Sequence, residues 1–390
     1  MPDILHVQSA AAALRRWTVA EALPFWGEAA YDASRGSFIE RADFSGRPLA
    51  DVPRRTMVQA RQIYVFAHAA LLGWRPEGRE IAIAAAHNLI DVHLSPDGQP
   101  GWIFSATPEG DIHDARRDFY AHSFALFGLA WAYRLEPQQH FLDAAVQTMD
   151  WLDAHFSSPA GGYHAALPPD PDALLQNPHM HLFEAMIAWF EATGEARFLA
   201  RAAEIRGLMA ARFFQPQTGI LAEYFDGGWN PLEGSRGRIC EPGHHFEWSW
   251  LLQRYARTIG RTRDSIAGSL FDFANRHGFD AEGLIADECL DDGSVHKASR
   301  RCWPHTEGIK ANAAAFEAGD RRAAGRAAKI VERLMGVFLA RPVPGGWIDH
   351  VDERGSPLVA FMPASTLYHV FLAAAEADRV WGTGQGNAQR

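Results

Sequence analysis

LFEAMIAWF, residues 182–190, is apolar around most of its circumference and is followed closely by ARFLARAAEIRGLMAARFF, residues 196–214. The second segment has arginines on one helical face and Leu, Ile, Met and Phe on the other. A helix that is apolar nearly all round must be buried between other helices, whereas an amphipathic helix belongs on an outer layer. The two segments therefore predict one inner helix and one outer helix.

Similar pairs recur along all 390 residues. Inner helices are expected at 54–73, 115–134, 176–193, 243–259, 303–318 and 364–379. Outer helices are expected at 9–31, 77–93, 137–155, 196–214, 263–276 and 320–340. A glycine followed within two residues by an aromatic or aliphatic side chain recurs between them, at Gly36, Gly101, Gly162, Gly219, Gly283 and Gly346. These glycines are typical of turn and packing elements.

Six polar residues repeat with the same period, with gaps of 61, 59, 63, 63 and 62 residues: Arg61, His122, His181, His244, Glu307 and His369. A fixed period over the whole length indicates one supersecondary unit repeated six times. The predicted fold is all-α, an (α/α)6 barrel of six inner and six outer helices with short hairpins in the connecting loops. We expect residues 1–390 to form a single catalytic domain. A propeller or β-sandwich is disfavoured, because no unit contains several alternating strands.

Composition excludes several classes of function. The formal net charge of -10 argues against nucleic acid or an anionic membrane as a partner. No run reaches 18 apolar residues, so no membrane-spanning helix is expected. The three cysteines, Cys240, Cys289 and Cys302, show no metal-type spacing. They suit a reduced state in the cytoplasm, where we expect the protein to act as a monomer or homodimer.

Each of the six repeated polar residues lies in the first turns of an inner helix, which would bring all six to one end of the barrel. In a regular ring Arg61 would lie opposite His244, His122 opposite Glu307, and His181 opposite His369. A buried set of imidazoles, carboxylates and a guanidinium is costly unless a polar cavity accepts it. The period therefore predicts a polar site on the ring axis.

Two local motifs add detail to this site. His181 and Glu184 are three residues apart and share a helix face, as do His244 and Glu247. This spacing lets a carboxylate orient an imidazole, and we expect Glu247 to orient His244.

The histidines also allow a structural interpretation and a zinc-binding one. A single histidine on an apolar helix is usually structural, and this interpretation stays open for each histidine taken alone. Zinc bound by His181, His244 and His369 is disfavoured, because their spacing differs from that of zincins. We therefore expect no metal and no cofactor.

Several of these segments resemble the N-acylglucosamine 2-epimerase superfamily, over residues 10–380. The resemblance rests on Gln59-Ala-Arg61, Asp118-Phe-Tyr-Ala-His122, QNPHMHLFE (176–184), EPGHHFEW (241–248) and Tyr368-His369. It is most similar to the bacterial mannose isomerase and sulfoquinovose isomerase branch, and cellobiose 2-epimerases share the same ring. The fold that this resemblance implies is the barrel already predicted from the period.

The resemblance also implies roles for individual residues. His244 and His369 match the acid/base pair, with Glu247 and His181 as further catalytic candidates. Substrate-binding candidates are Arg61, Tyr120, His122, Asn177, Glu184, Arg238, Trp248, Trp303 and Glu307. Among these, the indole rings of Trp248 and Trp303 offer flat apolar surfaces to the CH faces of a sugar ring.

The expected reaction is isomerisation of D-mannose to D-fructose through an enediol. It requires a base at C2, an acid near O1 or O2 and a stabiliser of negative charge. We expect His369 to be the base, His244 its partner and Arg61 the stabiliser. A sugar 2-epimerase, a glycoside hydrolase on the same barrel and a non-catalytic sugar-binding module remain alternatives. A phosphorylated sugar would need a basic cluster, for which Arg116-Arg117 and Arg300-Arg301 are available. Such arginine pairs more often lie on the surface, so we expect an unphosphorylated monosaccharide.

Overall fold

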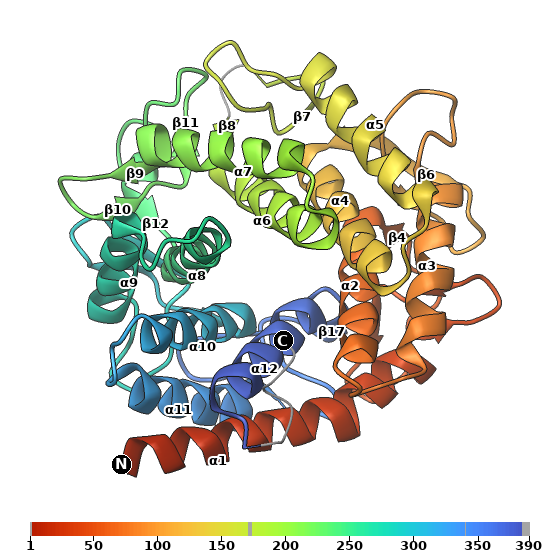
Figure 1. The fold of residues 1–390 in the computed structure, drawn as a ribbon. Coiled ribbons are helices and arrows are strands. Elements are labelled where there is room, and N and C mark those ends of the chain that lie inside the picture. The colour runs from red at the N-terminus through yellow and green to blue at the C-terminus, as the bar shows by residue number, and fades with distance from the viewer. Residues whose placement is uncertain (1, 171–173, 340, 384–390) are drawn as a thin grey trace.

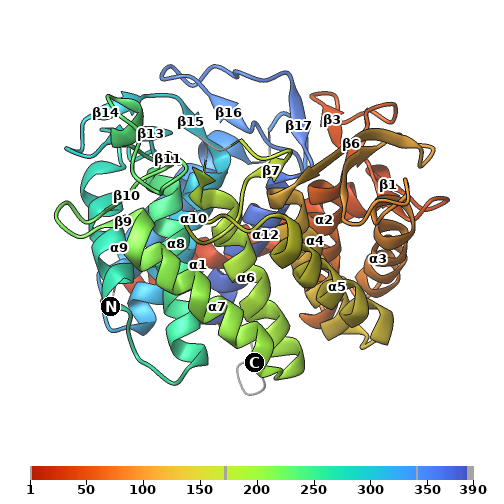
Figure 2. The ribbon, with the colours of Figure 1, turned by 90° about the horizontal axis from the view of Figure 1, so that it is seen from above.

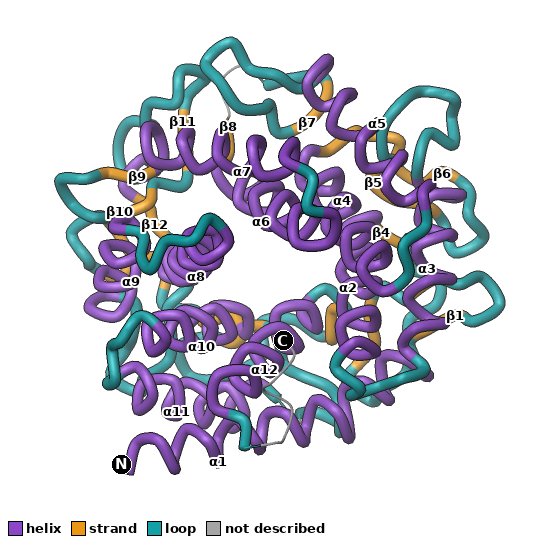
Figure 3. Tube along the Cα trace, viewed as in Figure 1, coloured by secondary structure: helices purple, strands orange, loops and turns teal. Residues whose placement is uncertain are grey.

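The computed structural model describes residues 2–170, 174–339 and 341–383. Its described part contains twelve α-helices, arranged as an inner and an outer ring (Figure 1) and coloured purple in Figure 3. The inner helices are α2 (Thr56–Leu71), α4 (Phe119–Leu135), α6 (Gln176–Thr193), α8 (Pro242–Thr258), α10 (Cys302–Glu317) and α12 (Thr366–Trp381). The outer helices are α1 (Pro2–Trp17), α3 (Gly78–His93), α5 (Gln139–His155), α7 (Ala196–Leu208), α9 (Ser265–His277) and α11 (Ala323–Arg333).

The inner ring is closed. Going round it, α2 contacts α4, α4 contacts α6, α6 contacts α8, α8 contacts α10, α10 contacts α12, and α12 contacts α2 again. Five outer helices each pack on the inner helix that precedes them in the chain. The sixth outer position is filled by α1, which packs on α12 and α11. The two ends of the chain therefore close the ring together.

Burial separates the two helix types as the sequence predicts. The inner helix α4 buries 14 of its 17 residues. The outer helix α7 buries only Phe198, Ala202 and Ile205, a single stripe at helical spacing. The prediction of inner and outer helices from residues 182–190 and 196–214 is confirmed.

Short strands in the connecting loops gather at one end of the ring (Figure 2). Most form two-stranded pairs, with one three-stranded and one four-stranded sheet. The pairing of β17 with β3 joins the last loop to the first. The strands are β1 (Tyr31–Asp32), β2 (Ser37–Phe38), β3 (Arg41–Asp43), β4 (Arg54–Arg55), β5 (Ile103–Ala106), β6 (Ile112–Asp118), β7 (Ala166–Leu167), β8 (Leu174–Leu175), β9 (Phe214–Gln215), β10 (Ile220–Leu221), β11 (Tyr224–Phe225), β12 (Ile239–Cys240), β13 (Glu288–Leu290), β14 (Val295–Lys297), β15 (Arg300–Arg301), β16 (His350–Val351) and β17 (Phe361–Pro363).

Two helices begin four or more residues away from their expected starts. The helix expected at 115–134 begins at Phe119, because residues 112–118 pair with β5 and β7 as strand β6. The helix expected at 9–31 begins at Pro2, because Val7 and Leu14 are buried where α1 packs on α11 and α12. Residue 340, the expected end of the helix at 320–340, lies outside the described residues.

Five inner helices are tied to the preceding loop by one buried side chain each, and we call these five the lock residues. Each lock residue accepts a hydrogen bond from a loop backbone N–H that lies one or two residues after one of the repeated glycines. In four of them the side chain is an imidazole whose Nε2 accepts at 2.9–3.0 Å, and whose Nδ1–H donates to the carbonyl four residues earlier. The lock residues are Gln59, His122, His179, His245 and His305.

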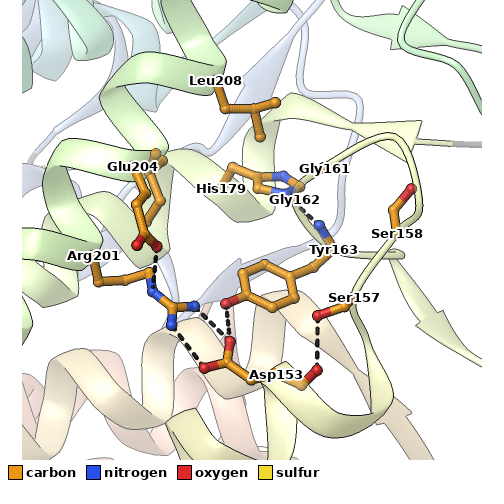
Figure 4. Close-up of a pocket in the computed structure, with 11 residues that line it drawn as sticks. Asp153, Ser157, Ser158, Gly161, Gly162, Tyr163, His179, Arg201, Glu204 and Leu208 are labelled. Carbon is orange, nitrogen blue, oxygen red and sulfur yellow. Dashed lines mark hydrogen bonds and ion pairs between the residues drawn. The ribbon is translucent and has the colours of Figure 1, made fainter.

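The lock imidazoles are neutral, as this pattern of one donor and one acceptor requires. Burial lowers the pKa of His122 to about 3 and that of His179 to about 4. At the His179 lock, shown with its bond to the Tyr163 N–H in Figure 4, a Cβ on Gly162 would lie 2.6 Å from the imidazole Nε2. Gly162, with φ of 68°, is therefore required for the loop to approach the helix. The repeated glycine motif and the inner-helix histidines form one structural device.

The cysteines of the described part form no disulfide bond. Cys240, Cys289 and Cys302 are free and buried. No described helix combines the length and apolar character needed to cross a membrane.

His122→Ala should lower the free energy of unfolding by about 1–3 kcal/mol, because it leaves the buried Trp102 N–H without an acceptor. Urea denaturation followed by circular dichroism measures this change. The control is His122→Gln, since Gln59 makes the same contact in the first repeat. Equal stability of the Ala variant and the wild type would contradict the structural role of His122.

Candidate active site

A pocket of about 180 Å³ opens at the end of the ring that carries the strands. Every inner helix contributes at least one side chain to its wall, and two more side chains come from the positions just before α8 and α10. The lining residues are Arg61, Tyr120, Asn177, His181, Glu241, His244, Glu247, Arg301, Trp303 and His369. Residues from the whole length of the chain thus meet around the ring axis.

His369 lies in the wall of this pocket, and its imidazole is held by the carboxylate of Glu307. Its Nδ1 is 2.8 Å from Oε1 of Glu307, a fully buried carboxylate. A carboxylate only accepts, so Nδ1 carries the proton and the Nε2 lone pair is left for the pocket. Burial, together with the positive charges of Arg61 and Lys310, holds the pKa of His369 well below its usual value of 6.5. His369 is therefore a neutral imidazole suited to accept a proton.

His244 has the opposite preference. Its Nδ1 donates to Oε2 of Glu223 at 3.0 Å, and Oε2 of Glu241 lies 3.9 Å away. Burial alone would lower the pKa of His244, but the negative charges of Glu223 and Glu241 outweigh it and raise the pKa to about 9. His244 is an imidazolium at neutral pH and can donate a proton. The expectation that Glu247 orients His244 is wrong, because Glu223 holds Nδ1.

Trp303 lies against both imidazoles. Its ring centroid is 5.1 Å from that of His244 and 5.6 Å from that of His369. Arg61 completes this part of the wall, donating to Tyr120 Oη at 2.7 Å and to the Ser365 carbonyl at 3.2 Å. The pocket thus combines a flat apolar surface, a guanidinium and two imidazoles.

Glu247 adds a carboxylic acid to the wall. Its Oε1 is buried and has no hydrogen-bond partner in the described part of the chain. Burial and the nearby charge of Glu307 raise the pKa of Glu247 well above 4.5. Asn177 Oδ1 is likewise buried and unpartnered among the described side chains. Both groups are free to bond hydroxyls of a ligand.

His181 lines the pocket and is held by a carboxylate that lies behind it. Its Nδ1 is 3.5 Å from Oε2 of Glu184, and the same carboxylate oxygen accepts a 2.5 Å bond from Tyr368. Burial lowers the pKa of His181 to about 4. Glu184 and Glu307 therefore lie behind the pocket wall and position the imidazoles instead of lining the cavity.

Besides Glu184 and Glu307, three further candidate binding residues do not reach the pocket. His122 points away from the axis, because it is a lock residue with both ring nitrogens bonded to backbone. Its expected place opposite Glu307 is therefore wrong. Trp248 is fully buried, with Nε1 donating to Gln176 and its ring stacked on Phe183. Arg238 lies in a loop on the surface.

The guanidinium of Arg238 is taken up by two aspartates of the neighbouring loop. It bonds Asp291 at 2.7 Å and Asp292 at 2.8 Å and is substantially exposed. In addition to Arg61, the structure brings the guanidinium of Arg301 to the pocket. It is ion-paired with Glu241 at 2.8 Å and with Asp287 at 3.0 Å.

Sequence reasoning missed Glu223, Glu241 and Arg301 as site residues. Glu223 comes from the loop between β10 and β11, where no helical period applies. Glu241 and Arg301 stand immediately before α8 and α10, so their position at a helix start was the available signal. A pair of adjacent arginines is more often a surface feature, and Arg300 does turn away to bond Asp280.

Among the described residues, three groups of side chains have ligand atoms within 4.8 Å of one another, the spacing that a metal ion would require: His181 with Glu184 and Glu247, Glu223 with Glu241 and His244, and Glu247 with Glu307 and His369. None combines the three histidines of the zinc hypothesis. In each group at least one carboxylate already has a cationic or hydrogen-bonded partner, so we assign none of them to a metal.

A second pocket of about 280 Å³ lies outside the inner ring, between α5 and α7 (Figure 4). Its charged groups bond each other: Arg201 forms two bonds with Asp153, which also accepts from Tyr163. This mutual pairing leaves little for a ligand to bind, so the pocket on the axis is the candidate site.

The chain is similar to known proteins over most of its length. The N-acylglucosamine 2-epimerase (GlcNAc 2-epimerase) family profile matches residues 36–373. The chain is 36% identical over 389 residues to a protein of Rhizobium meliloti (strain 1021) named mannose-6-phosphate isomerase, covering 96% of this chain and 97% of the relative. It is 28% identical to a D-mannose isomerase of Thermobifida fusca, covering 80% of this chain and 81% of the relative.

The fold is also similar to a solved structure. The cellobiose 2-epimerase of Bacillus thermoamylovorans B4167 superposes with a TM-score of 0.85 at 20% identity, covering 95% of this chain and 99% of the other. At this identity the likeness concerns the fold alone.

Glu223→Gln should lower the pKa of His244 from about 9 by roughly 1–3 units, because it removes the nearest negative charge. The charge of His244 contributes to folding stability below pH 6.5, and the contribution is lost as the pH rises through about 9. NMR titration of the imidazole measures the pKa. Glu241→Gln is the matched control and should have a smaller effect, since its carboxylate is 3.9 Å away instead of 3.0 Å. An unchanged His244 pKa in Glu223→Gln would refute the assignment.

Proposed function

The chain belongs to the N-acylglucosamine 2-epimerase family, and from that premise we propose that it interconverts D-mannose and D-fructose. Its curated relatives make it a sugar isomerase or epimerase, and the mannose isomerase branch includes the more similar of them. One observation carries the finer proposal: two imidazoles with opposite pKa shifts line the same pocket. Paired groups whose pKa values are driven apart are the usual mark of an acid and a base.

The proposed reaction moves one proton between carbons and one between oxygens. His369 Nε2 removes the proton from C2 of the open-chain aldose and returns it to C1, through an enediol. The His244 imidazolium donates a proton to O1 and, now neutral, takes up the proton of O2. The imidazolium is thereby restored, so charge and atoms balance. The guanidinium of Arg61 stabilises negative charge on oxygen during the transfer. Each positioned acid or base contributes on the order of 10²–10⁴ in rate.

The fold, domain organisation and cellular location are also part of what we propose. We take the double ring of helices to be an (α/α)6 barrel, with residues 1–390 acting as one catalytic domain in the cytoplasm. The six inner helices that supply the pocket all belong to this ring.

We propose an unphosphorylated hexose as the substrate, although the relative from Rhizobium meliloti is named for mannose 6-phosphate. A phosphate dianion binds well where several cations have no other partner. In this pocket Arg301 is already paired with Glu241 and Asp287, which leaves Arg61 as the guanidinium without a carboxylate partner in the described residues.

A sugar 2-epimerase is the second candidate. Epimerisation also begins with proton removal at C2 but returns a proton to the opposite face of that carbon. His244 supports it, because this imidazolium approaches the pocket from α8 while His369 approaches from α12. A glycoside hydrolase has less support. The nearest atoms of Glu247 and Glu307 lie within 4.8 Å, whereas inversion needs carboxylates about 6.5–9.5 Å apart.

The purified protein should convert D-mannose to D-fructose in D2O, with partial incorporation of deuterium at C1 of fructose as the base exchanges its proton with solvent. NMR of the sugar mixture measures both. Mannose 6-phosphate should react more slowly, by at least about tenfold, because it brings a charge with no unpaired cationic cluster to meet it. Mannose formed from glucose without any ketose would replace the isomerase with the epimerase. Faster turnover of the phosphorylated sugar would overturn the substrate assignment.

His369→Ala and His244→Ala provide the matched controls for the same assay. Each should lower kcat by at least about 10²-fold while the circular dichroism spectrum stays unchanged. His122→Gln, which alters an imidazole outside the pocket, should retain near-normal kcat. Near-normal turnover in either pocket variant would remove the acid/base assignment.

A further inference from the structure

Lys310 is a lysine in an unusual place. The chain contains 37 lysines and arginines, and only three of them are lysines. One of these three, Lys310 in α10, has a fully buried side chain. A buried ammonium is costly and normally loses its proton unless anions compensate it. Neither the family resemblance nor the mechanism so far gives this residue a task.

The surroundings of Lys310 keep it charged. Its Nζ is 2.5 Å from Oε2 of Glu307 and lies 4.3 Å from the ring centroid of Trp250. Burial would lower the pKa of Lys310, but the carboxyl groups of Glu307, Glu247 and Glu184 outweigh it and raise the pKa. These carboxyl groups come from α10, α8 and α6, so the ammonium faces acidic side chains of three inner helices.

Lys310 does not line the pocket and so does not touch the substrate there. It acts on a group that does. Glu307 uses Oε2 for Lys310 and Oε1 for the Nδ1 of His369, which makes a continuous row of ammonium, carboxylate and imidazole. The only member of this row exposed to the pocket is His369.

We propose that Lys310 is the positioning residue of the catalytic base, holding Glu307 ionised so that His369 stays neutral with its proton on Nδ1. A lysine suits this task better than an arginine, because its ammonium is a compact point charge that fits a fully enclosed space. Without it, Glu307 and His369 would together retain one more proton, and the base would be lost. The assignment rests on the proposed role of His369.

The charges around His369 agree with this division of labour. Positive charge reaches it from Arg61 on α2 and from Lys310 on α10, and from His181 on α6 only when that imidazole is protonated. Negative charge reaches it from Glu184 on α6 and Glu307 on α10. Burial raises the pKa of the Glu307 carboxyl, and Lys310 works against that rise. The ammonium therefore favours the ionised carboxylate and the neutral imidazole at the same time.

Lys310→Met tests the inference through the pH dependence of kcat/KM for the sugar that the wild type converts. The acid limb of this profile reports protonation of the free enzyme's essential base. Removal of the ammonium should move the limb to higher pH by roughly one unit or more, so that kcat/KM on the limb falls about tenfold or more. A limb at the wild-type pH would overturn the proposal, whatever happens to the maximal rate.

Two further variants separate positioning from mere loss of structure. Lys329→Met makes the same change on the exposed face of outer helix α11 and should leave the profile unchanged. Lys310→Met combined with Glu307→Gln removes the orphaned carboxylate together with the ammonium. It should return the acid limb toward the wild-type pH, because the amide that replaces the carboxylate cannot share a proton with His369. If the double variant keeps the shifted limb, the row from Lys310 to His369 does not set the protonation of the base.

Failure of this inference differs from failure of the proposed function. If the wild-type protein shows no sugar isomerase or epimerase turnover, or if His369→Ala remains active, the function fails. If wild-type turnover depends on His369 but the limb is insensitive to Lys310, only the positioning role falls.

Discussion

Pairing between buried imidazoles and buried carboxylates organises the centre of this ring. His244 and His369 have the same immediate arrangement, with Nδ1 bonded to a buried carboxylate. Their protonation nevertheless differs, because the next shell of charge differs. Around His244 a second carboxylate reinforces the first, whereas around His369 the positive charges of Arg61 and Lys310 oppose it. The balance of neighbouring charges, more than the hydrogen bond itself, separates the proposed acid from the proposed base.

This electrostatic arrangement depends on the way the inner helices are held. A helix turns by about 100° per residue, so a residue two positions beyond a lock residue points in nearly the opposite direction. Arg61 follows Gln59, His181 follows His179, Glu247 follows His245 and Glu307 follows His305 at this distance. The lock side chains bond the loops on the outside of the inner ring, and the residues two positions later face its axis. Each loop contact therefore fixes the rotation of a helix and with it the direction of a pocket side chain.

The same relation explains how far the sequence could predict the site. The period of about 62 residues and the two helix types sufficed for the ring, because burial of an apolar stripe leaves few other arrangements. The polar series, however, mixed two helix faces: His122 is a lock residue, and the axial residue of its helix is Phe124, which lies under Arg61. A histidine facing the axis and one facing a loop are indistinguishable by type and approximate spacing.

Other site residues had no periodic signal. Glu223 stands in a loop whose path depends on the tertiary pairing of β8 with β11, and Lys310 matters only through its contact with Glu307. The four-residue spacing predicts that Trp248 shares a helix face with His244, but the neighbouring Phe183 and Gln176 bury the Trp248 ring. Contacts between distant segments determine where each of these side chains lies, and the local sequence pattern does not predict such contacts.

The protonation state of His369 links the charge balance, the row of side chains from Lys310 and the proposed chemistry, because all three depend on it. The imidazole 15N chemical shifts of this residue at neutral pH, assigned by comparison with His369→Gln, report that state directly. The account predicts a neutral ring with the proton on Nδ1 and a free lone pair on Nε2. An imidazolium, or a neutral ring with the proton on Nε2, would contradict it.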